Sequence, residues 1–149
     1  MADLCSVFRE YLVSVKKASP NTVESYMRDI HQYSEYCTSN GRDTETADSA
    51  LIKKYVEYLS GKGKSDATVS RTVASVRCYY RFLISKNIIE ENPVNGIKLK
   101  KAEKKLPGIL DSNEIILLLS QPDGDDYKSV RDKAMLELLY ATGIRVSEL

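Results

Sequence analysis

The sequence has 149 residues, of which 42% are hydrophobic and 29% charged, and its net charge at pH 7 is +1. That length suits one domain of ordinary size, or one domain and part of another. No stretch approaches the roughly 18 apolar residues of a membrane span, and no basic-then-apolar leader follows Met1, so we expect a cytoplasmic protein without membrane or secretory segments.

Apolar residues recur at three- and four-residue spacing in three successive stretches, which predicts three amphipathic helices. The first helix is expected at about 3–17. The second follows an N-cap at Ser19 or Asn21 and ends at Asn40. The third is expected at about 48–60, before a glycine-rich break.

A fourth helix is predicted from Ser65 or Asp66 to about Lys86. Five apolar residues at four- and three-residue spacing give it a single core-facing stripe: Val69, Val73, Val76, Tyr80 and Leu83. Four polar residues are expected on the opposite side: Lys64, Thr68, Arg71 and Ser75. Cys78 and Phe82 fall outside the stripe, so either a second side of this helix is contacted or the face assignment is wrong.

Positive charge gathers on this fourth helix. Between Lys62 and Lys86 six basic residues accompany one acidic residue, Asp66. The hydroxyls and free backbone amides of the first turn add anion-binding groups. The pattern is typical of a helix that enters a DNA groove by its N-terminal half, and a merely solvated basic face is the alternative.

A basic linker is predicted after Pro93. Residues 97–108 read IKLKKAEKKLPG, with five lysines against Glu103 alone. They form either an extended segment crossing a phosphate backbone or a flexible tether. Overall, residues 1–108 carry 18 Lys and Arg against 13 Asp and Glu, whereas residues 109–149 carry 4 against 8, so only the first part is suited to a polyanion.

Two helices are expected beyond the linker. Asp111 and Glu114 form an N-terminal capping pair for the first, and a polar loop leads to the second, an almost wholly apolar helix that we expect to be buried. Gly143 ends that helix. Arg145 follows between apolar neighbours, a suitable way to hold a cation rigidly toward an anion.

Cysteine and histidine usage argues against disulfides and metals. The three cysteines, Cys5, Cys37 and Cys78, are far apart within predicted helices, and His31 is the only histidine. We expect reduced thiols in or near the core, and neither a metal site nor a cofactor.

Residues 131–149, RDKAMLELLYATGIRVSEL, resemble the first arginine motif of the tyrosine recombinases, closest to Xer-type recombinases and phage integrases. That motif runs R-D-x-A-x-x-x-L-x-x-x-T-G-[LI]-R-x-[SG]-E-[LI], and every fixed position is filled. The start of the second helix is similar to the family's S-x-x-T-x-x-x-Y-x-R-D-L segment, with Ile30 replacing leucine.

The resemblance implies an all-α chain: a SAM-like four-helix core-binding bundle followed by the first helices of a truncated catalytic domain. The implied domains are residues 1–97 (DNA-binding core-binding domain), 98–108 (interdomain linker) and 109–149 (N-terminal fragment of the catalytic domain). The implied partners are double-stranded DNA and, in a full-length protein, other recombinase protomers.

The resemblance also implies site residues. Arg145 would be the first of two arginines that grip the scissile phosphate, and Glu148 would orient it or simply start a helix. Candidate DNA contacts are Thr22, Ser25, Arg28, Lys64, Thr68, Arg71, Ser75, Arg77, Lys98, Lys100 and Lys101.

The family cleaves DNA through a 3′-phosphotyrosyl intermediate, and its later motifs and nucleophilic tyrosine lie downstream of Leu149. We therefore expect this fragment to bind duplex DNA without cleaving it. The competing hypothesis is a non-catalytic helical interaction or regulatory module, such as a truncated competitor of a recombinase; a module that binds a protein would carry an apolar groove instead of a basic one.

Overall fold

The computed structural model describes residues 4–99 and 108–149. Within these residues all regular structure is helical, which confirms the predicted all-α class. The chain divides into two compact units, Met1–Glu103 and Lys104–Leu149. The helices are α1 (Leu4–Ser14), α2 (Pro20–Ser39), α3 (Ser49–Gly61), α4 (Asp66–Ser85), α5 (Ser112–Leu119), α6 (Tyr127–Thr142) and the 3₁₀ turn η1 (Val146–Glu148).

The N-terminal caps explain where the helices begin. The side chain of Ser19 accepts a hydrogen bond from the Thr22 backbone N–H, and Ser65 does the same for Thr68, so each serine satisfies one amide that its helix leaves unpaired. Asp48 caps α3 in the same way. Two cap positions that the sequence left open, before α2 and before α4, are therefore both occupied by serine.

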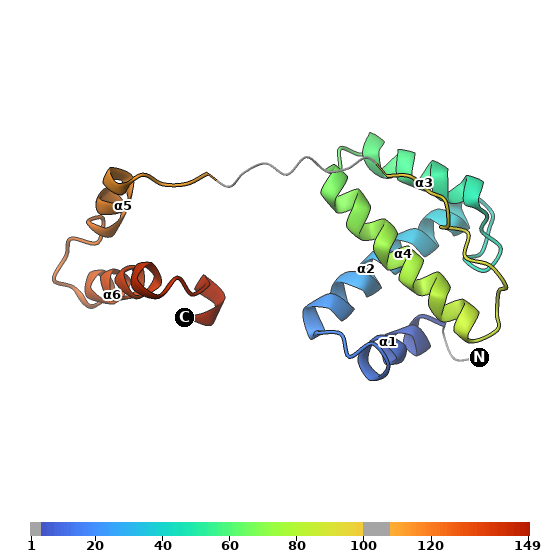
Figure 1. The fold of residues 1–149 in the computed structure, drawn as a ribbon, viewed down its shortest axis with the longest axis horizontal. Helices are drawn as coiled ribbons and strands as arrows, with labels where there is room; N and C mark the ends of the chain where they lie inside the picture. The colour runs from blue at the N-terminus through green and yellow to red at the C-terminus, as the bar shows by residue number, and fades with distance from the viewer. Residues whose placement is uncertain (1–3, 100–107) are drawn as a thin grey trace. The chain divides into compact units, whose positions relative to one another are not determined.

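Helix α4 lies at the centre of the first unit and packs against α1, α2 and α3 (Figure 1). Its predicted core stripe is confirmed, because all five of its residues are buried: Val69, Val73, Val76, Tyr80 and Leu83. Burying an apolar side chain of this size contributes roughly 1.5–3 kcal/mol. Helix α4 contributes seven of the nineteen buried hydrophobic residues, more than any other helix of the described chain.

A second side of α4 is also buried, by α1. The ring of Phe82 lies 5.4 Å from that of Phe8 and 5.3 Å from that of Tyr11, measured between centroids. Phe8 also meets Tyr79 edge-on at 5.1 Å. The position of Phe82 outside the predicted stripe therefore reflects this second contact, one of the two explanations that the sequence left open.

The α2–α3 loop is tied to α4 by buried hydroxyls. Tyr80 donates to the backbone oxygen of Thr44 at 2.8 Å, and the Tyr33 and Tyr80 hydroxyl oxygens are 2.7 Å apart. Burial raises the pKa of both tyrosines, so both remain protonated. Because the Tyr80 hydroxyl donates its proton to the hydrogen bond with the Thr44 carbonyl, it must accept in the other bond, and Tyr33 is the donor.

The second unit contains α5, α6 and η1. The predicted capping box is confirmed: the Glu114 N–H donates to Asp111 and the Asp111 N–H donates to Glu114, both at 2.8 Å. Gly143 ends α6 in the left-handed region at φ 65°. The expectation of a buried helix is wrong for this structure, because no residue of α6 is buried, and Leu138 and Tyr140 are 47% and 63% exposed.

Among residues 4–99 and 108–149, no helix combines the length and apolar character needed to cross a bilayer. Among the described residues, the buried Cys37 and the half-buried Cys78 carry free thiols.

Candidate nucleic-acid interface

Two hollows lie between α2 and α4. The first, the Arg71 hollow, has a volume of about 150 Å³ and is lined by residues of α2, the end of α3, and α4 with the residues just before it. It brings together four of the predicted DNA contacts: Arg28, Lys64, Thr68 and Arg71. The three basic side chains are exposed and Thr68 is half-buried, so all four reach the surface.

The second hollow, the Arg81 hollow, has a volume of about 370 Å³. It contains the predicted contacts Thr22 and Arg77, together with Lys16 and Arg81, which were not predicted. Arg81 follows Arg77 by one helical turn, so helical spacing alone could have placed it beside Arg77 on the same face. Lys16 comes from the α1–α2 connection, and no sequence pattern places that connection against α4.

We call the surface formed by the two hollows the basic face. Its six cationic residues are Lys16, Arg28, Lys64, Arg71, Arg77 and Arg81. Cys78 also lies in the Arg81 hollow, where burial raises the pKa of its thiol against the opposing effect of Lys16 and Arg81. The thiol therefore stays neutral and does not reduce the positive charge of the face.

One buried carboxylate lies beneath the basic face. Asp29 of α2 is 4% exposed and accepts hydrogen bonds from three side chains of α4. Arg71 donates through both terminal nitrogens, Nη1 to Oδ2 at 2.8 Å and Nη2 to Oδ1 at 3.1 Å. Ser75 Oγ donates to Oδ2 at 2.7 Å and Thr72 Oγ1 to Oδ1 at 3.4 Å. The carboxylate thus joins α2 to α4 directly below the surface.

The prediction for Ser75 is wrong in its placement. The sequence pattern puts this residue on the polar face of α4, but its side chain is fully buried, with 0% exposure. Its hydroxyl bonds Asp29 across the α2–α4 contact. The hydroxyl was expected to face solvent because the helical pattern does not reveal that α2 covers this position. We therefore remove Ser75 from the candidate DNA contacts.

Thr22 and Thr68 occupy equivalent positions in the two helices. Each is the third residue of its helix, and its hydroxyl lies 2.9 Å from that of the capping serine, Ser19 or Ser65. Helices α2 and α4 therefore start with the same S-x-x-T arrangement, and the threonine of each lines one of the two hollows. Ser25, one turn further along α2, is half-buried and lines neither hollow.

The predicted linker contacts do not join this group. Lys98 is exposed and lines a different hollow, between α3 and α4, together with Lys53, Glu57 and Asp66. Those two carboxylates balance the local lysines. Lys100 and Lys101, also predicted as contacts, lie outside the described residues.

In the second unit, Arg145 is 82% exposed. Its Nη1 lies 3.3 Å from a carboxylate oxygen of Glu148, and its backbone N–H donates to the other oxygen at 2.8 Å. One carboxylate of Glu148 therefore both caps η1 and contacts the guanidinium. The arginine keeps most of its surface for an anion.

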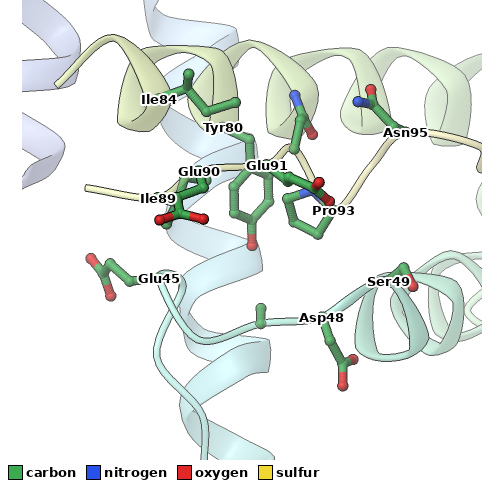
Figure 2. A pocket seen from close by; sticks show the side chains of 12 residues that line it. Glu45, Asp48, Ser49, Tyr80, Ile84, Ile89, Glu90, Glu91, Pro93 and Asn95 are labelled. Carbon is green, nitrogen blue, oxygen red and sulfur yellow. The ribbon is translucent and has the colours of Figure 1, made fainter. Parts of the chain in front are cut away.

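The largest hollow described has the opposite charge. Its volume is about 680 Å³, and it lies between the segment carrying Glu90 and Glu91 and the loop carrying Glu45 and Asp48 (Figure 2). Tyr80 reaches it from α4. Four carboxylates around one opening repel a phosphate backbone, so size alone does not make this hollow a nucleic-acid site.

Comparison with known proteins gives a family match over residues 6–87, to the phage integrase N-terminal SAM-like domain. A protein of Caldanaerobacter subterraneus subsp. tengcongensis, provisionally named as a tyrosine recombinase, is 42% identical over 142 residues. The tyrosine recombinases XerD of Halalkalibacterium halodurans and Staphylococcus aureus are 39% and 34% identical over 133 and 148 residues.

These alignments cover 95%, 88% and 97% of the present chain but 49%, 44% and 50% of the relatives. The chain thus spans about half the length of the curated relatives it matches. The match at residues 6–87 includes nearly all of α1–α4, the elements that build the basic face.

Proposed function

We propose, since this chain belongs to the tyrosine recombinase family and carries its SAM-like core-binding domain, that its first unit binds double-stranded DNA through the basic face. The observation that carries the proposal is the gathering of six cationic side chains along two hollows between α2 and α4. Thr22 and Thr68, in the first turns of these helices, add a hydroxyl to each hollow.

The face is suited to two kinds of contact. Unpaired cations such as Lys64 and Arg81 can neutralise phosphates and release condensed counterions, a contribution independent of sequence. An α-helix fits the major groove of B-DNA, so side chains near the start of α4 can reach base edges. We propose α4 as the helix that enters the groove, with α2 beside it.

For a protein of the relatives' full length, we propose DNA breakage and rejoining through a 3′-phosphotyrosyl intermediate. In that reaction Arg145 would stabilise negative charge on the scissile phosphate, with Glu148 fixing its orientation. Other protomers on the same DNA would be the protein partners. The exposure of the Arg145 guanidinium supports this role, because a phosphate could reach it directly.

The binding proposal is tested with the full chain and a fluorescent random-sequence duplex, measuring affinity between about 50 and 200 mM salt. Lys64→Glu and Arg81→Glu are each expected to weaken binding on the order of tenfold and to flatten the salt dependence, by roughly 0.9 in slope for each lost phosphate contact. Lys53→Glu, an equal charge reversal at an exposed residue of α3, is the matched control and is expected to change affinity less than twofold. Equal losses in all three variants would contradict an interface on the basic face.

One observation favours the alternative of a protein-binding module. Several large apolar side chains of α5 and α6 are exposed: Ile116, Leu117, Leu118, Val130, Leu138 and Tyr140. Such a surface suits a protein partner. Heparin chromatography separates the two functions, because DNA binding predicts salt-dependent retention that Lys64→Glu reduces, whereas an apolar docking module predicts passage in the void volume.

A further inference from the structure

Arg71 differs from the other cations of the basic face. Among the described residues, it is the only one of the six that forms an ion pair, with Asp29. The other five have no carboxylate within salt-bridge distance in the described parts of the chain. Two kinds of basic side chain therefore share one surface, and they are suited to different parts of a DNA duplex.

The pair with Asp29 fixes the guanidinium in place. The Asp29 side chain is 5% exposed, whereas that of Arg71 is 47% exposed. Each carboxylate oxygen receives one Arg71 N–H and one hydroxyl, from Thr72 or Ser75, so Asp29 itself cannot turn without breaking several bonds. The arginine is thus held before any ligand arrives, which lowers the entropy cost of binding through it.

The held arginine keeps donors for another ligand. A guanidinium has five N–H donors, and Asp29 takes one from each terminal nitrogen. No other acceptor in the described residues bonds the side chain of Arg71. Nε and the adjacent terminal nitrogen therefore still present two parallel N–H groups, the geometry that a pair of neighbouring acceptors requires.

The net charge of the Arg71–Asp29 pair determines whether a phosphate or a neutral base edge is the better acceptor for the remaining N–H groups. Asp29 compensates the charge of Arg71, so the pair has little net attraction for an anionic phosphate. Its directional hydrogen bonds are unaffected. The O6 and N7 atoms of guanine are neutral acceptors, side by side in the major groove, and they match the fork of an arginine. The unpaired Lys64 and Arg28 in the same hollow are better suited to the phosphates.

We propose that Arg71 reads a guanine edge and that Asp29 is the positioning residue that makes this reading possible. The inference rests on the proposed DNA-binding function and deepens it, because it assigns sequence preference to one buried pair and general affinity to the unpaired cations. Asp29 touches no DNA in this arrangement. It acts by holding Arg71 against α2.

The test begins with the wild-type full chain, which selects preferred sequences from a pool of random 30-bp duplexes. The measured quantity is the ratio of its affinities for selected and random duplexes. Asp29→Asn, which keeps the shape of the side chain and removes its charge, is expected to lower this ratio about tenfold, a typical value for one lost bidentate base contact. Affinity for random duplexes should rise, because a negative charge beneath the basic face is gone.

Lys64→Gln is the control for an unpaired cation. It is expected to weaken binding to selected and random duplexes equally, to reduce the salt slope by about 0.9, and to leave the ratio unchanged. Replacing the guanines of the selected duplex by 7-deazaguanine, which lacks the N7 acceptor, should weaken wild-type binding but not binding by Asp29→Asn. If Asp29→Asn does not fold, Arg71→Lys keeps the charge and removes the fork, and the ratio should fall in the same way.

The inference and the proposed function fail in different ways. If the wild type binds no duplex, both are overturned. A second outcome is that Lys64→Gln weakens binding as expected, whereas Asp29→Asn leaves the ratio of the two affinities unchanged. The DNA interface then stands, and the role of Asp29 is overturned. A wild type that selects no preferred sequence, or one that is insensitive to 7-deazaguanine, also overturns the reading of guanine.

Discussion

At the scale of single residues, the polar groups buried in the core have unequal importance. The hydroxyl of Tyr80 is the middle member of a chain that runs from Tyr33 to the Thr44 carbonyl. The hydroxyl of Tyr55 is equally buried, yet within the described residues it has no hydrogen-bond partner. Because an unsatisfied buried group costs more than a typical hydrogen bond gains, the three tyrosines should respond differently to loss of the hydroxyl.

Tyr80→Phe is expected to destabilise the first unit by roughly 2–4 kcal/mol, because it leaves both the Tyr33 donor and the Thr44 acceptor without a partner. Tyr33→Phe removes the donor to Tyr80 but leaves the bond from Tyr80 to Thr44, and it should cost about 1 kcal/mol. Tyr55→Phe removes an unsatisfied group and should be neutral or slightly stabilising. Urea unfolding followed by circular dichroism measures all three, and equal effects of Tyr80→Phe and Tyr33→Phe would contradict the assigned direction of the chain.

The candidate site divides at the same scale into predictable and unpredictable residues. Helical spacing and charge were enough to identify Lys64, Thr68 and Arg71, which reach the surface together. The burial of Ser75 and its bond to Asp29 were not predictable in this way, because they arise from the crossing of two helices 46 positions apart in the chain. A periodic pattern reports on one helix and contains no information about its partner.

At the scale of elements, capping and breaking signals made most helix boundaries predictable, and the end of α1 is the exception. Serine and aspartate signals located the starts of α2, α3 and α4, where the structure places caps. The end of α1 was predicted at about Lys17, but the helix ends at Ser14. Lys17 takes the left-handed conformation, at φ 49°, in a position where glycine is the usual signal. The sequence lacked that signal, so the predicted helix was too long.

The cap of α4 gives a prediction at this scale. Ser65→Ala is expected to destabilise the first unit by about 1 kcal/mol, because the Thr68 N–H loses its acceptor. Ser65→Gly should recover most of that loss, since glycine in this position costs only a few tenths of a kcal/mol relative to serine. Thermal unfolding compares the two, and a glycine variant less stable than the alanine variant would contradict this account of the cap.

At the scale of the whole molecule, the two units differ in what stabilises them. The first has a core that includes fully buried aromatic residues from all four of its helices, such as Phe8, Tyr33, Tyr55 and Phe82. In residues 108–149 no described side chain is buried. Sequence patterns predicted the helices of both units equally well, but the apolar run of α6 gave no measure of whether anything would cover it. Helix formation is a local property, whereas burial depends on the surrounding chain.

This difference predicts unequal protection from hydrogen exchange. Amides of α2 and α4 should exchange only through global unfolding of the first unit, because their helices are held by a buried core. Amides of α6 should exchange orders of magnitude faster, because none of its residues is buried and a helix of 16 residues without such burial is marginally stable in water. Mass spectrometry of peptides from the intact chain measures both.

Capping of α6 alone does not remove the difference in hydrogen-exchange protection between the two units. Asp126 and Gly143 supply good ends to α6, yet a cap contributes about 1 kcal/mol, far less than the 5–15 kcal/mol of a stable domain. The contrast in exchange rates should therefore persist when α6 is made a better helix by Val130→Ala, which replaces an exposed β-branched residue. Protection of α6 equal to that of α4 would contradict it, because only burial of Leu138 and its apolar neighbours against other parts of a protein could supply the missing stability.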